Sequence, residues 1–510
     1  MKARDTSDFE GTPERQFDHH LLHQVTYDTL LKAERKLGHG AAARWMQART
    51  QGRGAEFLAM TGEHAERAGE TALAIDCFEQ AGLDARKRFA NAIAQSYCRR
   101  ALALLGEADP GRSVDLLDAL GMIADIMGDR ATQDAVHRDI AAILERHPDD
   151  VCLARLLSDK ALLADRRSDS AASERLARQA IEVAERCGAA QSAAMAQGQL
   201  AWLHIARQDY AGANRHIEAG LPWAGKIEDA VGRANTEAQL LTLSGIVAIF
   251  LSRLDEARRT LMAVLSRGEA LGKPRSQLGA MDNLAVVAGT LGRWDEVAAW
   301  GDRMSTLAHA IGARHHIALG QLHLAEAAAA LGDAAAAMNW HAQSLAIHRA
   351  TGNRRCEAIT LRWLGALQLE RGDAQTALQY CDQALTMHQT LKEPLEACLA
   401  AAIAARCAVH QSQPADALAG LNATLDRLQR ELADCRAHET IDLRWNCQRA
   451  LVALGDERAG PLLEQLHADV LATAAERTDA TDRERLIQAI PTFRDIVAAY
   501  AGRGGQAAPQ

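Results

Sequence analysis

Small residues recur along this chain at a spacing of forty residues, and this spacing constrains the fold more than any other feature. One set of positions holds only Gly or Ala, with a single step of 44 after its third member: Gly121, Ala161, Ala201, Gly245, Ala285, Ala325, Gly365 and Ala405. A second set follows the first after twelve residues and is also mostly small: Gln133, Ser173, Ala213, Ala257, Val297, Ala337, Ala377 and Ala417. Self-similarity at periods of about 20–50 residues is typical of solenoids, in which each unit buries its apolar face by stacking on its neighbours.

One unit of the repeat spans Gln277–Gly312 and is expected to be a pair of antiparallel helices. Apolar residues from Leu278 to Ala288 fall at helical spacing, and Gly292 then supplies a stop. A second apolar helix is expected to begin near Trp294 and to end at Gly312. Where the two helices approach most closely there is room only for Gly or Ala, which explains the small residues at both sets of positions.

Composition favours a soluble, helical protein. Of the 510 residues, 24% are charged and 48% hydrophobic, and there are only 10 prolines. The net charge of −9, from 57 basic and 66 acidic residues, argues against broad nucleic-acid binding, which needs a concentrated basic surface. We therefore expect no direct nucleic-acid partner.

The sequence shows no secretory signal and no membrane span. Residues 1–17 are polar and charged, and the longest apolar stretch, Ala325–Met338, is broken by Gly332 and Asp333. The ten cysteines contain no C-x-x-C pair, so we expect reduced thiols and a cytoplasmic location with no membrane partner.

The unit resembles a tetratricopeptide repeat (TPR). An apolar residue precedes a small one in Leu284-Ala285, Leu324-Ala325 and Leu364-Gly365, a turn follows, and a small residue comes twelve positions later. The period is forty rather than the thirty-four of that family, so the helices should be long. The resemblance implies an all-α solenoid of stacked antiparallel hairpins. The expected organisation is a disordered tail at 1–16, a helical junction at 17–55, a superhelix of about ten hairpins at 56–471, capping helices at 472–501 and a disordered tail at 502–510.

The two ends carry a second resemblance. Phe17–Trp45 and Gly62–Leu105 are similar to the junction and opening repeats that follow the ATPase core of bacterial STAND-type regulators and ATPase-fused nucleotidyl cyclases. Glu484–Tyr500 is similar to the usual end of those proteins. In that family an ATPase or cyclase core precedes the junction, whereas here Met1 stands just before it. The resemblance implies a sensor region that lacks the catalytic domains.

No motif in the sequence supports catalysis, a cofactor or a metal site. Gly220–Ile227 fits the phosphate-binding pattern G-x-x-x-x-G-K, but Ile227 stands where a Ser or Thr hydroxyl would bind magnesium. We interpret this segment as an extra-long turn that accounts for the 44-residue step. The 19 histidines, among them His19 and His23 at i,i+4 spacing, lack the three or four convergent ligands of a zinc site. We therefore expect neither an enzyme nor a cofactor.

The repeat register does predict a binding surface. Residues of each first helix that do not pack within the hairpin should line the inner face of the superhelix, and the candidate groove consists of Trp202, Ile205, Ile246, Ile249, Phe250, Leu322, Arg362 and Arg406. Its apolar part spans adjacent units and would hold an amphipathic helix or an extended peptide. The alternative is that these apolar side chains pack between neighbouring repeats.

Two functions follow. The first is a non-enzymatic TPR-like scaffold that binds a protein or peptide, as a signalling or transcription-regulatory sensor module. The second is the sensor half of a split or truncated STAND ATPase or nucleotidyl cyclase regulator, which acts on a separately encoded ATPase or cyclase core. The oligomeric state is left open by the sequence.

Overall fold

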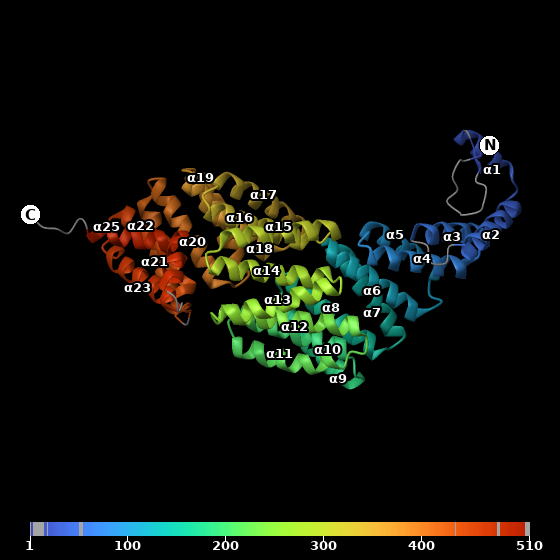
Figure 1. Cartoon of the computed structure of the whole chain (residues 1–510), viewed down its shortest axis with the longest axis horizontal. Helices are drawn as coiled ribbons and strands as arrows, with labels where there is room; N and C mark the ends of the chain where they lie inside the picture. The colour runs from blue at the N-terminus through green and yellow to red at the C-terminus, as the bar shows by residue number, and fades with distance from the viewer. Residues whose placement is uncertain are drawn as a thin grey trace, which may run out of the picture. The chain divides into compact units, whose positions relative to one another are not determined.

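The structure of the protein is a computed structural model that describes residues 2–3, 15–17, 19–49, 55–433, 435–476 and 480–504. These residues form 25 α-helices, one 3₁₀ helix and one pair of two-residue strands. Most helices pack mainly against their neighbours in the chain, so that within each compact unit the helices stack in sequence order (Figure 1). The predicted all-α fold of stacked antiparallel hairpins is confirmed.

The chain divides into two compact units, Met1–Leu156 and Leu157–Gln510, and the division falls inside α8 (Asp150–Arg166). The elements of the first unit are β1 (Lys2–Ala3), β2 (Arg15–Gln16), α1 (His20–Thr29), α2 (Lys32–Arg49), α3 (Ala55–Ala68), α4 (Thr71–Lys87), α5 (Asn91–Leu105), α6 (Pro110–Met127) and α7 (Arg130–Arg146). β1 and β2 pair antiparallel, with Lys2 opposite Gln16. They lie within the range predicted as a disordered tail, whose other residues lie outside the described ones.

The second unit contains the rest of the array. Its hairpins are α10 (Ala190–Ala206) with α11 (Tyr210–Gly225), α12 (Ala230–Phe250) with α13 (Leu254–Ala270), α14 (Pro274–Thr290) with α15 (Trp294–Ile311), α16 (Arg314–Ala330) with α17 (Ala334–Thr351), α18 (Arg354–Glu370) with α19 (Ala374–Thr390), and α20 (Pro394–His410) with α21 (Pro414–Arg430). α9 (Ser170–Cys187) contacts α10 and shares an apolar cluster with the second half of α8. The unit ends with η1 (Ala437–Thr440), α22 (Ile441–Leu454), α23 (Ala459–Ala475), α24 (Ala480–Ala489) and α25 (Pro491–Gly504). α25 extends three residues into the predicted C-terminal tail.

Glycine and aspartate mark the helix ends. Gly312, predicted to end a unit, and Gly352, one period later, adopt left-handed φ values of 67° and 66° just after α15 and α17, a conformation that glycine takes without a steric cost. Asp333 and Asp373 precede the second helices α17 and α19. Their side chains accept hydrogen bonds from the backbone N–H groups of Ala336 and Thr376, as N-caps do.

The small residues lie where the helices of a hairpin meet. A Cβ placed on Gly365 of α18 would lie 2.5 Å from the Sγ of Cys381 and 3.2 Å from the carbonyl oxygen of Ala377, both on α19. Ala377 itself is completely buried. Helix separation in the hairpin therefore depends on the absence of a side chain at Gly365, as the spacing predicts.

The interpretation of Gly220–Ile227 as an extra-long turn was wrong. Most of the segment is helical, because α11 continues to Gly225 with Pro222 inside it. A Cβ on Gly220 would lie 3.1 Å from Leu240 of α12, so close helix packing accounts for this glycine. Tertiary packing here outweighs the helix-breaking tendency of the Gly-Leu-Pro sequence. The added length lies largely in α12, which has 21 residues where α14 has 17.

The first helices of successive hairpins form one layer of the second unit. α10 contacts α12, α12 contacts α14, α18 contacts α20 and α20 contacts α22. From α11 to α21, successive second helices approach one another less closely than the first helices do. Such a difference in spacing gives a solenoid its curvature. The first helices therefore form the inner layer, and the candidate groove must be sought on them.

Candidate interaction surface

All eight predicted groove residues lie on first helices of the second unit. They divide into an apolar group on α10 and α12 and a second group on α16, α18 and α20: Trp202, Ile205, Ile246, Ile249 and Phe250, then Leu322, Arg362 and Arg406. The two groups differ in what they offer to a partner, so they are described separately.

The apolar group combines core and surface positions. Ile205 is only 4% exposed and packs in one cluster with Ile246, which is half-buried. Phe250 is 41% exposed, and its ring stacks on that of Tyr210 with the centroids 5.6 Å apart. Trp202 is half-buried. Ile205 thus serves packing between repeats, whereas Phe250 presents an aromatic face beside that packed cluster.

The second group is largely occupied by contacts within the protein. Leu322 is buried. The nearly buried Arg362 lies 3.1 Å from a carboxylate oxygen of Glu396, measured from its Nε. Arg406 donates hydrogen bonds to Glu370 and Asn446, each at 2.7 Å. These arginines hold successive repeats together, since each partner lies one repeat away in the chain.

A buried histidine between two carboxylates was missed by the sequence reading. His323 on α16 lies 2.8 Å from Asp282 of α14 through Nε2 and 3.5 Å from Glu326 through Nδ1. Burial lowers the pKa of His323, but the hydrogen bonds and attraction from the two carboxylates outweigh it and raise the pKa to about 10. The inner layer thus holds buried cations with more exposed carboxylates beside them. The repeat spacing could have indicated this pair, because Asp282 and His323 lie nearly one period apart and therefore on neighbouring first helices.

A second missed feature joins distant parts of the second unit. Arg436 donates a hydrogen bond to the carbonyl oxygen of Phe250, and its guanidinium carbon lies 6.0 Å from the centre of the Tyr210 ring. Trp294 Nε1 donates to the carbonyl oxygen of Ala489 at 2.7 Å. We call this set the closing contact, and its members are Gln208, Tyr210, Phe250 and Trp294 on one side and Cys435, Arg436 and Ala489 on the other.

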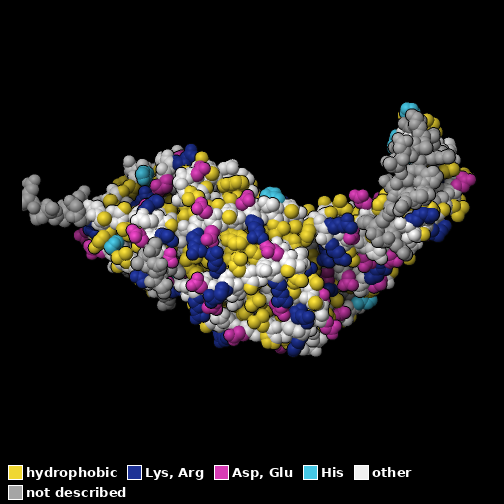
Figure 2. Space-filling view, in the orientation of Figure 1, with side chains coloured by type: hydrophobic (Ala, Val, Ile, Leu, Met, Phe, Trp, Pro, Cys, Tyr) yellow, Lys and Arg dark blue, Asp and Glu magenta, His cyan; other side chains and the backbone are white. Residues whose placement is uncertain are grey.

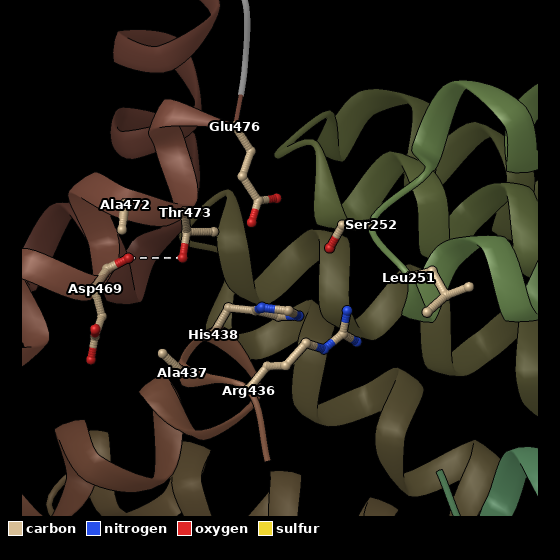
Figure 3. A pocket seen from close by; sticks show the side chains of 9 residues that line it. All are labelled: Leu251, Ser252, Arg436, Ala437, His438, Asp469, Ala472, Thr473 and Glu476. Carbon is tan, nitrogen blue, oxygen red and sulfur yellow. Dashed lines mark hydrogen bonds between the residues drawn. The ribbon is translucent and has the colours of Figure 1, made fainter. Parts of the chain in front are cut away.

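A cavity of about 490 Å³ lies beside the closing contact. One wall is the turn between α12 and α13, and the other comes from η1 and α23 (Figure 3). The lining residues are Leu251, Ser252, Arg436, Ala437, His438, Asp469, Ala472, Thr473 and Glu476. Arg436 is paired with Glu439 at 2.7 Å and Asp469 with Arg444 at 2.6 Å, so the charges of Arg436 and Asp469 are compensated within the protein.

The first unit carries an exposed apolar surface on α1 and α2. None of the ten residues of α1, all of which the structure describes, is buried. The large apolar side chains exposed on α1, on α2 and in the turn between them are Leu21, Leu22, Val25, Leu30, Leu31 and Leu37. Exposed apolar groups this close together are uncommon on surfaces that contact only water. They fall within the predicted junction at 17–55.

Hydrogen bonds between aromatic side chains connect α1 to the helices that follow. The Tyr27 hydroxyl lies 2.8 Å from Nε2 of His39, whose Nδ1 lies 2.8 Å from Nδ1 of His64 on α3. Arg35 lies over the Tyr27 ring. Burial lowers the pKa of His39, helped by His64 and Arg67, and burial and Arg67 likewise lower the pKa of His64 against an opposing effect of Glu63. One Nδ1 must donate and the other must accept, so the bond needs at least one neutral ring and is broken when both rings are protonated.

We expect acid to release α1. Since the folded pKa values of His39 and His64 lie below the usual 6.5, the contribution of this network is lost as the pH falls below about 6.5. Amide hydrogen exchange of residues 20–29 should therefore quicken between pH 7.5 and pH 5.5, after correction for intrinsic rates. A His39→Phe variant should show fast exchange at both pH values. Equal protection of α1 at both pH values in the unaltered chain would refute this role.

Membrane spans, groups of metal ligands and disulfides are absent from the described residues. None of their helices has the length and apolar character of a membrane span, and no group of three or more potential metal ligands occurs among them. Within the same residues the cysteines form no disulfide. On the face shown in Figure 2, acidic and basic side chains are intermingled.

Neither a protein-family model nor a curated protein sequence matches the chain. Among solved structures, a Rap protein complexed with competence and sporulation factor is similar, with a TM-score of 0.51 at 13% identity over 72% of this chain and 100% of that one. A STAND protein with a tetratricopeptide repeat sensor from Pyrococcus horikoshii gives a TM-score of 0.44 at 11% identity, covering 81% of this chain and 72% of that one. The apo form of the quorum sensor NprR from B. thuringiensis gives 0.41 at 13% identity over 67% and 97%.

The class of fold is now clear: the chain is an α-solenoid of TPR-like hairpins. The predicted resemblance to tetratricopeptide-repeat proteins is confirmed. At these identities the likeness extends to the fold alone.

Proposed function

We propose that the chain is a non-enzymatic TPR-like scaffold that binds a protein or peptide, and that it works in the cytoplasm as a sensor module in signalling or transcription regulation. The Rap structure supports this proposal, because a similar arrangement of helices there is complexed with competence and sporulation factor. The observation that carries it in this chain is the exposed, stacked aromatic side chain of Phe250 at the end of an inner-layer helix.

The partner would lie along α10 and α12. Trp202, Ile249 and Phe250 retain exposed surface there, next to the packed Ile205 and Ile246. Such a face suits the apolar side of an amphipathic helix, or an extended peptide in which alternate side chains are apolar. Leu322, Arg362 and Arg406 complete the predicted groove as residues that fix the spacing of the neighbouring repeats.

Replacement of Phe250 by Asp tests this assignment. Aromatic anchors at interface centres commonly contribute about 2 kcal/mol or more, so we expect binding of a captured and then purified partner to weaken at least about thirtyfold. Trp202→Ala should weaken it in the same direction. The matched control is Leu331→Asp, which places the same charge on an exposed residue in the turn between α16 and α17. Unchanged affinity in both groove variants, with the fold intact, would remove this surface from the proposal.

The exposed apolar residues of α1 and α2 favour a second candidate function. In that case the chain is the sensor half of a split STAND ATPase or nucleotidyl cyclase regulator, and the junction docks a separately encoded ATPase or cyclase core. Leu21→Ser and Leu22→Ser would then abolish capture of that partner while helicity stays unchanged. Capture that survives both changes would rule out the junction as the docking surface.

A further inference from the structure

The second unit is closed by contacts between segments that lie far apart in the chain. Gln208 meets Cys435 across 227 residues of sequence, Arg436 meets Phe250 across 186, and Trp294 meets Ala489 across 195. On one side these residues lie in or directly beside three consecutive turns: Gln208 in the turn between α10 and α11, Phe250 at the end of α12 and Trp294 at the start of α15. On the other side they come from the segment before α22 and from the end of α24. The C-terminal helices thus return to one edge of the earlier hairpins.

This closure is thin and mostly polar. The described apolar cluster of α10–α12 and the two described clusters of α20–α25 each contain residues from one side only. The contacts described between the sides are a few hydrogen bonds, the Arg436 guanidinium over Tyr210 and the close approach of Gly292 to Ala489, with a cavity next to them (Figure 3). Elements that are joined by few buried apolar contacts separate more readily than elements that share a core.

Phe250 belongs both to the closing contact and to the apolar face of α10 and α12. Its carbonyl oxygen accepts the hydrogen bond from Arg436, while its ring stacks on Tyr210, which the same guanidinium covers. A partner that packs on Phe250 and Tyr210 therefore competes with Arg436 for the same surface. Closure of the second unit and binding of a partner to this face are therefore coupled, because both use Phe250 and Tyr210.

We propose that the second unit alternates between a closed form, held by the closing contact, and an open form that takes up the partner on α10 and α12. The coupling to a partner rests on the function proposed above, whereas the opening itself does not. A partner that binds only the open form shifts the equilibrium by its difference in affinity for the two forms.

Cross-linking of the full chain tests the opening without any partner. Gln208→Cys places a thiol opposite the native Cys435, because the Gln208 amide nitrogen lies 4.0 Å from Cys435 Sγ. A bismaleimide with a short spacer should link the two thiols in the otherwise unaltered chain. Adding Arg436→Ala or Trp294→Phe should lower the rate of linking, by about tenfold for Arg436→Ala, the change expected for a lost charge-assisted hydrogen bond. Trp294→Phe removes the indole donor and keeps a ring in its apolar cluster.

A hydrophobic dye reports on the apolar face in the same samples. Anilinonaphthalene sulfonate should fluoresce more with the Arg436→Ala chain than with the unaltered chain. Molecules that the cross-link holds in the closed form should not show this increase in dye fluorescence. Controls are the chain that keeps the native Gln208, which should not link, and Arg458→Ala, which removes an exposed arginine paired with Asp456 and Asn422. Circular dichroism verifies the fold of each variant.

Two results would overturn the proposal. One is failure of the folded Gln208→Cys chain to form the link to Cys435, because the closed form would then not exist. The other is linking at an unchanged rate after Arg436→Ala and Trp294→Phe. Loss of partner binding with normal cross-linking would instead count against the proposed function alone.

Discussion

Lowering the pH from 7.5 to 5.0 is expected to destabilise the second unit by about 4 kcal/mol through two histidines alone. The side chains of His341 and His348 on α17 are completely buried, and neither ring has a hydrogen-bond partner within the described part of the chain. Burial lowers the pKa of each to about 4. Between pH 6.5 and pH 4 the unfolded chain therefore binds more protons than the folded one, and the free energy of unfolding falls with the pH.

The double variant His341→Leu, His348→Leu separates this effect from that of the carboxylates. Urea unfolding across this pH range should show a shallower loss of stability for the variant, with the difference between the two chains growing as the pH falls. His323, with a pKa of about 10, stays protonated in the folded chain across this range, whereas in the unfolded chain it takes up a proton as the pH falls past about 6.5. Its contribution to stability is therefore fully present below about pH 6.5 and shrinks as the pH rises, opposite in sign to that of His341 and His348. Both chains keep His323, so its contribution cancels in the comparison. Parallel profiles for variant and unaltered chain would show that these histidines do not titrate as buried groups.

Replacing Gly365 with Leu is expected to destabilise the second unit by about 3 kcal/mol or more, because overpacking already costs about 1–3 kcal/mol for smaller additions. Even the Cβ of the new side chain would lie 2.5 Å from Cys381 Sγ, and the backbone of Ala377 blocks retreat. The helices of the α18–α19 hairpin must then separate. Thermal and urea unfolding measure the loss.

Gly121 provides the matched control, since it occupies the same repeat position on α6. A Cβ there would lie 3.4 Å from Val136, an ordinary contact, so Gly121→Ala should be neutral or stabilise by up to about 1 kcal/mol through helix propensity. If Gly365→Leu left the unfolding midpoint unchanged, the small residues would not set the distance between the helices of a hairpin.

Much of the fold could be predicted because each repeat needs small residues at the same two positions, so the pattern recurs many times in the sequence. Gly365 and Ala377 are small for a local reason, the close approach of two helices, and forty-residue spacing makes that reason visible in sequence. The segment at Gly220 was misinterpreted because a glycine two residues before a proline is typical of a turn, whereas this glycine allows close contact with Leu240. A single sequence does not distinguish these two uses of glycine.

The candidate surface was only partly predictable. Apolar residues on a first helix serve both packing and exposure, so the repeat register could not tell the buried Ile205 from the exposed Phe250. The partners of Arg406, Glu370 and Asn446, lie 36 and 40 residues away, so the repeat spacing could have predicted these contacts. The closing contact could not be predicted in this way, because it depends on the small rotations between successive hairpins, which add up along the solenoid.

Hydrogen exchange of the chain with and without its purified partner tests the proposed scaffold function most directly. Binding on the inner layer predicts slower exchange in the second half of α10 and around Phe250, at residues 198–206 and 242–252. Protection confined to residues 20–49 would contradict this and favour docking through the junction of the first unit.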